Sequence, residues 1–382
     1  MRKVPVWALE PGMKIARPVY CSQGTLLLNA GLEIKSEYIK HMQRLGILSV
    51  YIRDNIIPGI EIEDIILDET RQEAKKLISD FALEVQREQK FITPKISFAH
   101  QGIKKVLKKI IDQLLANPNL IINLSDIRTA DSYTFAHSVN VAVMALTTGI
   151  TLQIPLSRLL NLGIGALLHD LGKVKIPIDI LNKKGKLTPE EYEEIKKHPR
   201  YGYEMYKTQR DYMSATSALV IYQHHERMNG EGYPENLRGK QIHAYARICA
   251  VADVYDALVA DRPYRQAFQP HVALQIMGSA VDEFDPDVLR AFFQHIAAYP
   301  IGTLVGLSNG LIGVVIHNQA GFSFRPKVMV LGCKEKGRFE PLKPYELNLM
   351  EKIDIIIDEV YSVDELPAAI IKRDKRLLKE KR

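Results

Sequence analysis

A histidine and an aspartate stand side by side where core packing alone would not place them. His169-Asp170 follows the almost wholly apolar run from Leu159 to Leu168, and Gly172 is typical of a helix terminator. A carboxylate at the carboxyl end of a buried helix is disfavoured by the helix dipole and by desolvation. A cation held by both side chains would offset these two costs. The alternative is a hydrogen-bonded His-Asp pair of the core.

Two further histidines are ambiguous when each is taken alone. His137 lies in an apolar helix of small residues, where a histidine is usually a satisfied core residue. Thr188-Pro-Glu-Glu191 has the pattern of a capping box, which predicts a helix from Thr188 to His198 that Pro199 ends or bends. That joint would hold His198 rigidly, as a metal ligand requires, although polar residues at helix ends are equally ordinary.

A histidine pair and a buried acid complete the set. His224-His225 should close a helix that begins near Ser214. Successive helical residues point about 100° apart, so two neighbouring imidazoles suit two ions better than one. Asp253 lies inside an apolar helix, where a carboxylate needs a cation or a strong donor. Asp256 and Asp261 have milder surroundings, and we expect them to pair with Arg262 or Arg265.

These residues together indicate a metal centre. Five of the eleven histidines and two acids fall at helix ends or in apolar helices within one block. Imidazole and carboxylate without thiolate favour iron or manganese, with zinc as an alternative. Two such ions can activate water for attack on phosphorus.

The elements that must position this centre are mainly helical. We predict an all-helical core at residues 129–298, preceded by an amphipathic helical connector at 61–128. Residues 1–60 have short strand-like runs and one helix, typical of a small α/β module. Residues 299–365 carry the Asn309-Gly310 turn signal between β-like runs, so we predict a small β-rich appendage, followed by a basic tail at 366–382.

Composition excludes several classes of protein. The net charge is +6, but the tail from Lys372 to Arg382 holds seven Lys/Arg against two acids, which is +5 by itself, so a nucleic-acid polymer is not expected as a partner. The amino terminus lacks the apolar run of a signal peptide, and no apolar stretch approaches the ~20 residues of a membrane span. The three cysteines are too scattered for a disulfide framework. A cytoplasmic location is expected.

The order of the candidate ligands resembles the HD superfamily of metal-dependent phosphohydrolases. The runs His169-Asp-Leu-Gly-Lys173, His224-His-Glu-Arg-Met-Asn-Gly-Glu-Gly-Tyr-Pro234 and Asp261-Arg-Pro-Tyr-Arg265 are similar to the signature of its HD-GYP group. The resemblance covers about residues 129–298. Residues 1–60 also resemble a small accessory domain that is often found ahead of that domain.

The resemblance implies a ligand set and roles for the residues around it. Asp170 would bridge two metals and Lys173 would neutralise phosphate in the transition state. Arg262 and Arg265 would hold a phosphate or a guanine edge. Gly232-Tyr233-Pro234 would shape the loop over the site and could dock a GGDEF-type cyclase. The implied metal ligands are His137, His169, Asp170, His198, His224, His225 and Asp253.

Two positions depart from the family pattern. Tyr133 stands where some members carry a glutamate that recruits a third metal, so two divalent metals are expected. Asn229 replaces the usual aspartate before Gly-x-Gly-Tyr-Pro, which puts loop geometry or substrate preference in question.

The implied activity is hydrolysis of cyclic di-GMP to pGpG, with a second cut to GMP. One rival is another substrate for the same machinery, such as cyclic GMP-AMP. Another is a catalytically weak receptor for cyclic di-GMP, whose expected mark, a lost metal ligand, is absent from the sequence. A homodimer is one arrangement that the sequence allows.

Overall fold

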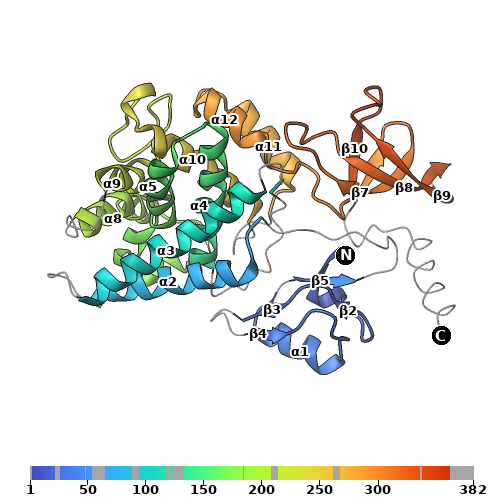
Figure 1. The fold of residues 1–382 in the computed structure, drawn as a ribbon, viewed down its shortest axis with the longest axis horizontal. Coiled ribbons are helices and arrows are strands. Elements are labelled where there is room, and N and C mark those ends of the chain that lie inside the picture. Colours follow the sequence, from blue (N-terminus) through green and yellow to red (C-terminus); the bar gives the residue numbers. More distant parts are fainter. Residues whose placement is uncertain are drawn as a thin grey trace. The chain divides into compact units, whose positions relative to one another are not determined.

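The computed structural model describes residues 2–21, 26–47, 49–53, 65–87, 94–117, 121–122, 133–183, 185–207, 214–260, 267–335 and 338–361 (Figure 1). The chain divides into two compact units. The first combines Met1–Asp64, Asn119–Tyr133 and Ile296–Arg382, and the second combines Ile65–Pro118 and Thr134–His295. The second unit contains every candidate metal ligand.

The amino-terminal part of the first unit is a small α/β module, as expected. Its antiparallel sheet has the order β1 (Arg2–Pro5), β5 (Ser49–Arg53), β2 (Lys14–Ile15). A hairpin of β3 (Val19–Tyr20) and β4 (Leu26–Leu28), a 3₁₀ turn at Val6–Ala8 and helix α1 (Ser36–Arg44) complete it. Apolar residues from all these segments form one core.

The carboxyl-terminal part of the first unit is a five-stranded antiparallel sheet. The strand order is β10 (Ile357–Tyr361), β6 (Leu304–Leu307), β7 (Leu311–His317), β8 (Lys327–Glu335), β9 (Arg338–Asn348). Gly310, with φ of +81°, makes the turn between β6 and β7, as the Asn-Gly signal predicted. The β-rich appendage is therefore confirmed, whereas the basic tail lies outside the described residues.

Two long helices open the second unit. α2 (Asp68–Arg87) and α3 (Pro94–Ala116) run antiparallel, because Leu67 pairs with Gln113 and Glu73 pairs with Lys109 nearer the connection between them. α3 packs on α5 (Leu156–Leu167), and α2 contacts the 3₁₀ helix η3 (Leu171–Lys175). The helices predicted as a connector thus belong to the same compact unit as the metal ligands.

The remaining helices surround the candidate ligands, in agreement with the predicted helical core. They are α4 (Tyr133–Thr151), α6 (Ile178–Leu181), α7 (Pro189–Ile195), α8 (His198–Lys207), α9 (Ala215–Gln223), the 3₁₀ helix η4 (Gly239–Gln241), α10 (Ala244–Val259), α11 (Pro270–Ser279) and α12 (Pro286–Phe293). α9 packs against α5, α8 and α10.

Two predicted helix ends are wrong. Gly172 was expected to terminate the apolar helix, but α5 ends at Leu167 and Gly172 lies inside η3. The capping box at Thr188 is present, but α7 ends at Ile195, and a new helix, α8, begins at His198. Pro199 therefore lies in the first turn of a helix instead of ending one. A proline is tolerated there because the first N–H groups of a helix have no intrahelical acceptor.

Candidate metal centre

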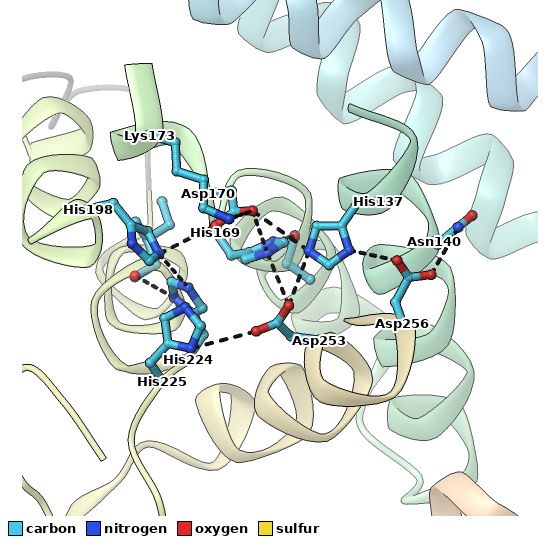
Figure 2. A network of polar contacts seen from close by, with 12 residues as sticks. His137, Asn140, His169, Asp170, Lys173, His198, His224, His225, Asp253 and Asp256 are labelled. Atoms are coloured by element: carbon cyan, nitrogen blue, oxygen red, sulfur yellow. Dashed lines mark hydrogen bonds and ion pairs between the residues drawn. The ribbon is translucent and has the colours of Figure 1, made fainter. Parts of the chain in front are cut away.

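The seven predicted metal ligands meet at one place in the second unit (Figure 2). His137 comes from α4, and Asp253 comes from α10. His169 and Asp170 lie in the turn between α5 and η3. His198 begins α8, and His224-His225 follow the last turn of α9. Six of the seven side chains are at least nine-tenths buried, and His225 is 18% exposed.

Three of these histidines are oriented by backbone carbonyls of their own chain segments. The Nδ1 atom of His169 lies 2.7 Å from the oxygen of Ala166. His198 Nδ1 makes the same contact with Ile195 at 2.7 Å, and His224 Nδ1 with Ile221 at 2.8 Å. A carbonyl oxygen can only accept, so each Nδ1 carries the proton and donates it. In the neutral ring the lone pair is then on Nε2, which faces the centre.

A contact between two ring nitrogens indicates that the centre needs a cation. His198 Nε2 lies 3.2 Å from His224 Nε2. With both Nδ1 atoms donating to carbonyls, neither neutral ring has a proton to place between these two nitrogens. Two buried lone pairs that face each other are stable when a cation accepts both. The donor set therefore fits a divalent metal.

Asp170 lies between two groups of nitrogen ligands. Its Oδ2 is 3.4 Å from His169 Nε2 and 3.7 Å from His137 Nε2, and its Oδ1 is 3.4 Å from His198 Nε2. Among the described residues, Asp170 belongs both to a group with His198, His224 and His225 and to a group with His137 and His169. Each group of nitrogens therefore faces a different oxygen of this carboxylate.

Asp253 closes the opposite side of the centre. Its Oδ1 lies 3.1 Å from His137 Nε2 and 3.8 Å from His169 Nε2, and its Oδ2 lies 3.7 Å from His225 Nδ1. Asp253 thus touches histidines of α4, the α5–η3 turn and the end of α9, as Figure 2 shows.

The electrostatics keep the carboxylates charged and most of the imidazoles neutral. Burial lowers the pKa of His198 to about 4, and burial also lowers the pKa of His224 and His225 well below the usual value. Burial opposes ionisation of Asp170, but Lys173 and the neighbouring histidines hold its pKa well below the usual value. Neutral imidazoles and ionised carboxylates are the forms that bind a metal.

His137 differs from the other histidines because two aspartates contact it. Burial would lower its pKa, but the hydrogen bonds to Asp253 and Asp256 outweigh burial and raise the pKa to about 9. Without a cation, His137 Nε2 therefore holds a proton that it shares with Asp253. A metal bound at that nitrogen would displace the proton.

Lys173 places a cationic side chain on a carboxylate of the centre. Its Nζ lies 2.6 Å from Asp170 Oδ2, and its side chain is 31% exposed. A lysine that touches a ligand carboxylate and still reaches solvent can meet an anionic group that enters from outside.

The loop that follows His225 is fixed by a buried glutamate. Glu226 is 2% exposed, and its two carboxylate oxygens accept hydrogen bonds from the backbone N–H groups of Glu235 and Leu237, at 2.8 and 2.9 Å. The ring of Tyr233 consequently stacks on His225, with centroids 4.6 Å apart. The predicted placement of Gly232-Tyr233-Pro234 beside the site agrees with this geometry.

Some of the predicted site residues lie outside the part of the chain that the structure describes. Arg262 and Arg265, proposed to bind substrate, lie outside the described residues, and so does Asp261. The side chain of Tyr133 is likewise outside them. Asn229 accepts a hydrogen bond from the N–H of Glu231 through Oδ1, a local turn contact that an aspartate could also make.

Two functional candidates were missed at the sequence level. Asp256 Oδ2 lies 2.7 Å from His137 Nδ1, and Asn140 Nδ2 donates to Asp256 Oδ1 at 3.1 Å. We expected Asp256 to pair with an arginine of the 262–265 segment. The signal that could have found both contacts is helical spacing: Asp256 follows Asp253 by three residues, and Asn140 follows His137 by three.

The comparison with family models agrees with this centre. Residues 113–288 match the model of the HD domain, and residues 304–369 match that of the KOW domain associated with HD domain. Residues 113–288 are therefore similar to the HD domain, which is the family that the order of the candidate ligands resembles. The HD-domain match contains all seven candidate ligands, and the KOW-type match contains the sheet of β6 to β10.

Curated relatives match the chain over part of their length. Cyclic di-GMP phosphodiesterase PA4108 of Pseudomonas aeruginosa is 38% identical over 59% of this chain and 54% of its own. Cyclic di-GMP phosphodiesterase response regulator RpfG of Xanthomonas campestris is 43% identical over 33% of this chain and 34% of its own. The 3'3'-cGAMP-specific phosphodiesterase 2 of Vibrio cholerae is 36% identical over 34% of this chain and 25% of its own. The chain thus spans about half of the first relative and less of the others.

In the part of the chain that the structure describes, no helix combines the length and the apolarity that a membrane crossing needs.

Proposed function

We propose that this chain is a metal-dependent phosphodiesterase that hydrolyses cyclic di-GMP to linear pGpG, with a second cut to GMP. The observation that carries the proposal is the pair of buried lone pairs on His198 and His224, next to a carboxylate shared by two ligand groups. This donor set suits two divalent cations. The names of the Pseudomonas and Xanthomonas relatives support the substrate.

The ligands would divide into two sets that share Asp170. His137, His169 and Asp253 would serve one cation, and His198, His224 and His225 the other. Imidazole with carboxylate favours iron or manganese, with zinc as the alternative. When bound, two such cations supply Lewis acidity toward a phosphate oxygen and lower the pKa of a water molecule.

The surrounding side chains would bind and orient the dinucleotide. Lys173, which already contacts Asp170, would place its positive charge beside the phosphate that is cleaved. Tyr233 would present an aromatic edge next to His225. Arg262 and Arg265 would hold the second phosphate or a guanine edge, as planar guanidinium groups do well.

A second candidate substrate is cyclic GMP-AMP. It has the same two phosphodiester bonds, and the similarity to a 3'3'-cGAMP-specific phosphodiesterase favours its inclusion. The metal ligands act on phosphate, so they do not discriminate between a guanine and an adenine. Discrimination would have to come from side chains that contact the base.

A panel of cyclic dinucleotides tests both candidates. The metal-loaded full chain is incubated with cyclic di-GMP, 3'3'-cyclic GMP-AMP and cyclic di-AMP, and the products are separated by chromatography. We expect cyclic di-GMP to give pGpG fastest, and we expect His169→Ala to give no product. Faster cleavage of cyclic GMP-AMP would establish the second candidate, and cleavage of none of the three would contradict the proposal.

The other sequence-level expectations stay predictions. A cytoplasmic location agrees with the cysteine usage and with an intracellular dinucleotide substrate. A GGDEF-type partner at Gly232-Tyr233-Pro234, a homodimer, and the lack of a nucleic-acid polymer as partner are also carried forward as predictions.

A further inference from the structure

A chain of buried polar side chains leads from helix α2 to the metal centre. Arg71 of α2 donates from Nη1 to Asn140 Oδ1 at 2.8 Å. Asn140 of α4 donates from Nδ2 to Asp256 Oδ1 at 3.1 Å, and Asp256 Oδ2 lies 2.7 Å from His137 Nδ1. Figure 2 shows the part of this chain from Asn140 to His137. All four residues are at most 7% exposed.

The donor and acceptor roles along this chain of side chains, from Arg71 to His137, can be assigned in one way only. Arg71 is a donor without acceptor atoms, so the amide oxygen of Asn140 must face it. The amide nitrogen of Asn140 then faces Asp256, which as a carboxylate can only accept. Asp256 in turn requires that His137 donate from Nδ1. The Nε2 atom of His137 is thereby directed to the centre, where it meets Asp253.

The chain also links two buried charges through one neutral amide. Buried charges are costly unless they are paired, so Arg71 and Asp256 are expected to stabilise each other through Asn140. Other hydrogen bonds at the start of α2 hold it against α3. These are Leu67 N–H and Thr70 Oγ1 with the Gln113 amide. Arg71 is thus a contact of α2 that leads to the metal centre.

We propose that Arg71 is a positioning residue for the metal ligand His137, so that the docking of α2 and metal binding at His137 stabilise each other. The proposal rests on the metal centre of the proposed function. α2 would act as part of the HD-GYP domain instead of as a passive connector. Because coupling between two events is reciprocal, metal binding should also hold α2 more firmly in place.

Metal titration tests the first half of the proposal. Metal-stripped full chain is titrated with Mn²⁺, and free Mn²⁺ is read from its paramagnetic resonance signal. Groups that orient a ligand typically contribute 10–100-fold in metal affinity, so Arg71→Met should weaken one of the two Mn²⁺ equivalents by roughly that factor. Gln113→Ala is the matched control, because it removes two hydrogen bonds at the start of α2 but leaves the Arg71–Asn140 contact and the α2–α3 packing in place, so a much smaller loss of affinity is expected.

Hydrogen exchange tests the reciprocal half. In the wild-type protein, Mn²⁺ should slow amide exchange in α2 (Asp68–Arg87). In Asn140→Ala, Mn²⁺ bound at the remaining ligands should no longer slow exchange there, because the link is cut. A purely structural Arg71 would give the same exchange in α2 with and without metal.

The outcomes separate the proposal from its alternatives. Wild-type affinity in Arg71→Met, or equal losses in Arg71→Met and Gln113→Ala, would overturn the positioning role. If Arg71→Met does not fold, the same titration is done with Asn140→Ala. We then expect one of the two Mn²⁺ equivalents to bind more weakly than in the wild-type protein. Failure of the wild-type chain to bind two Mn²⁺ would refute the proposed metal centre, whereas two tight equivalents in every variant would refute the positioning role alone.

Discussion

At the scale of single residues, each histidine is oriented by the ring nitrogen that points away from the centre. The hydrogen bond of that nitrogen determines which nitrogen is left to bind a metal. His169, His198 and His224 donate to carbonyls three residues earlier, a contact that the end of a helix provides. His137 is the fifth residue of α4, and the carbonyls that follow the start of a helix are engaged by the helix itself. It uses Asp256 instead, and this is why His137 depends on a second helix.

Lys173 gives the sharpest prediction at this scale. If its ammonium group stabilises charge on the phosphate, Lys173→Ala should retain both metals and lose kcat by roughly 100-fold or more, the scale of removing one preorganised donor. Single-turnover kinetics on metal-replete protein, beside its melting temperature, measure this. The structure adds that Lys173 also pairs with Asp170. Normal chemistry with a lowered melting temperature would show that this ion pair is its whole role.

The sequence predicted the seven candidate ligands that the structure brings together, but not the residues behind them. His169-Asp170 and His224-His225 are conspicuous because polar pairs interrupt apolar runs. Asp256 and Asn140 look like ordinary polar residues of a helix, because a polar residue three positions from a candidate ligand can equally well lie on the protein surface. Their role depends on α2, α4 and α10 meeting, and that is a tertiary fact which helical periodicity does not contain.

At the scale of elements, a close approach of two backbones sets the distance between His198 and Asp170. A Cβ atom on Gly172 would lie 1.9 Å from the carbonyl oxygen of His198 and 2.5 Å from the nitrogen of Gly202. The glycine therefore lets η3 pack directly on α8. Gly172 does not terminate α5 as the sequence predicted, and its packing role depends on the position of α8, which the local sequence does not contain.

Gly172→Ala should consequently separate α8 from Asp170. We expect the free energy of unfolding to fall by at least the ~1–3 kcal/mol that is typical of overpacking, with loss of the metal at His198. Urea unfolding and elemental analysis measure the two effects. Gly185→Ala is the control, because a Cβ there meets no atom within 4 Å. Equal behaviour of the two variants would refute the packing role.

At the scale of the whole molecule, the candidate ligands come from five separate segments, so metal binding at them would stabilise the folded state of the second unit. The ligand groups found among the described residues all lie in that unit. Its apolar helices were predictable from periodicity, and so were the strands of the first unit from their turn signals. The sequence did not predict which helices would belong to one unit, because that depends on contacts between distant segments such as α2 and η3.

Metal removal should therefore lower the thermal stability of the helical unit. A ligand at 100 times its Kd stabilises by about 2.7 kcal/mol, and each kcal/mol shifts the midpoint by roughly 2–4 °C for a unit of this size. We expect the circular dichroism melting midpoint to fall by about 5–10 °C when EDTA is added. Asp170→Ala should melt at one temperature with or without EDTA. A wild-type midpoint that ignores EDTA would contradict a structural contribution of the metals.

The most direct test of the account is the turnover of cyclic di-GMP by metal-stripped full chain as Mn²⁺ is returned. We expect no hydrolysis without metal, little hydrolysis at one equivalent of Mn²⁺, and full activity at two equivalents, with pGpG as the first product. Asp170→Ala should stay inactive throughout the titration, because its carboxylate lies in both ligand groups. Hydrolysis by metal-free protein, or two bound Mn²⁺ without cleavage of cyclic di-GMP, would contradict it.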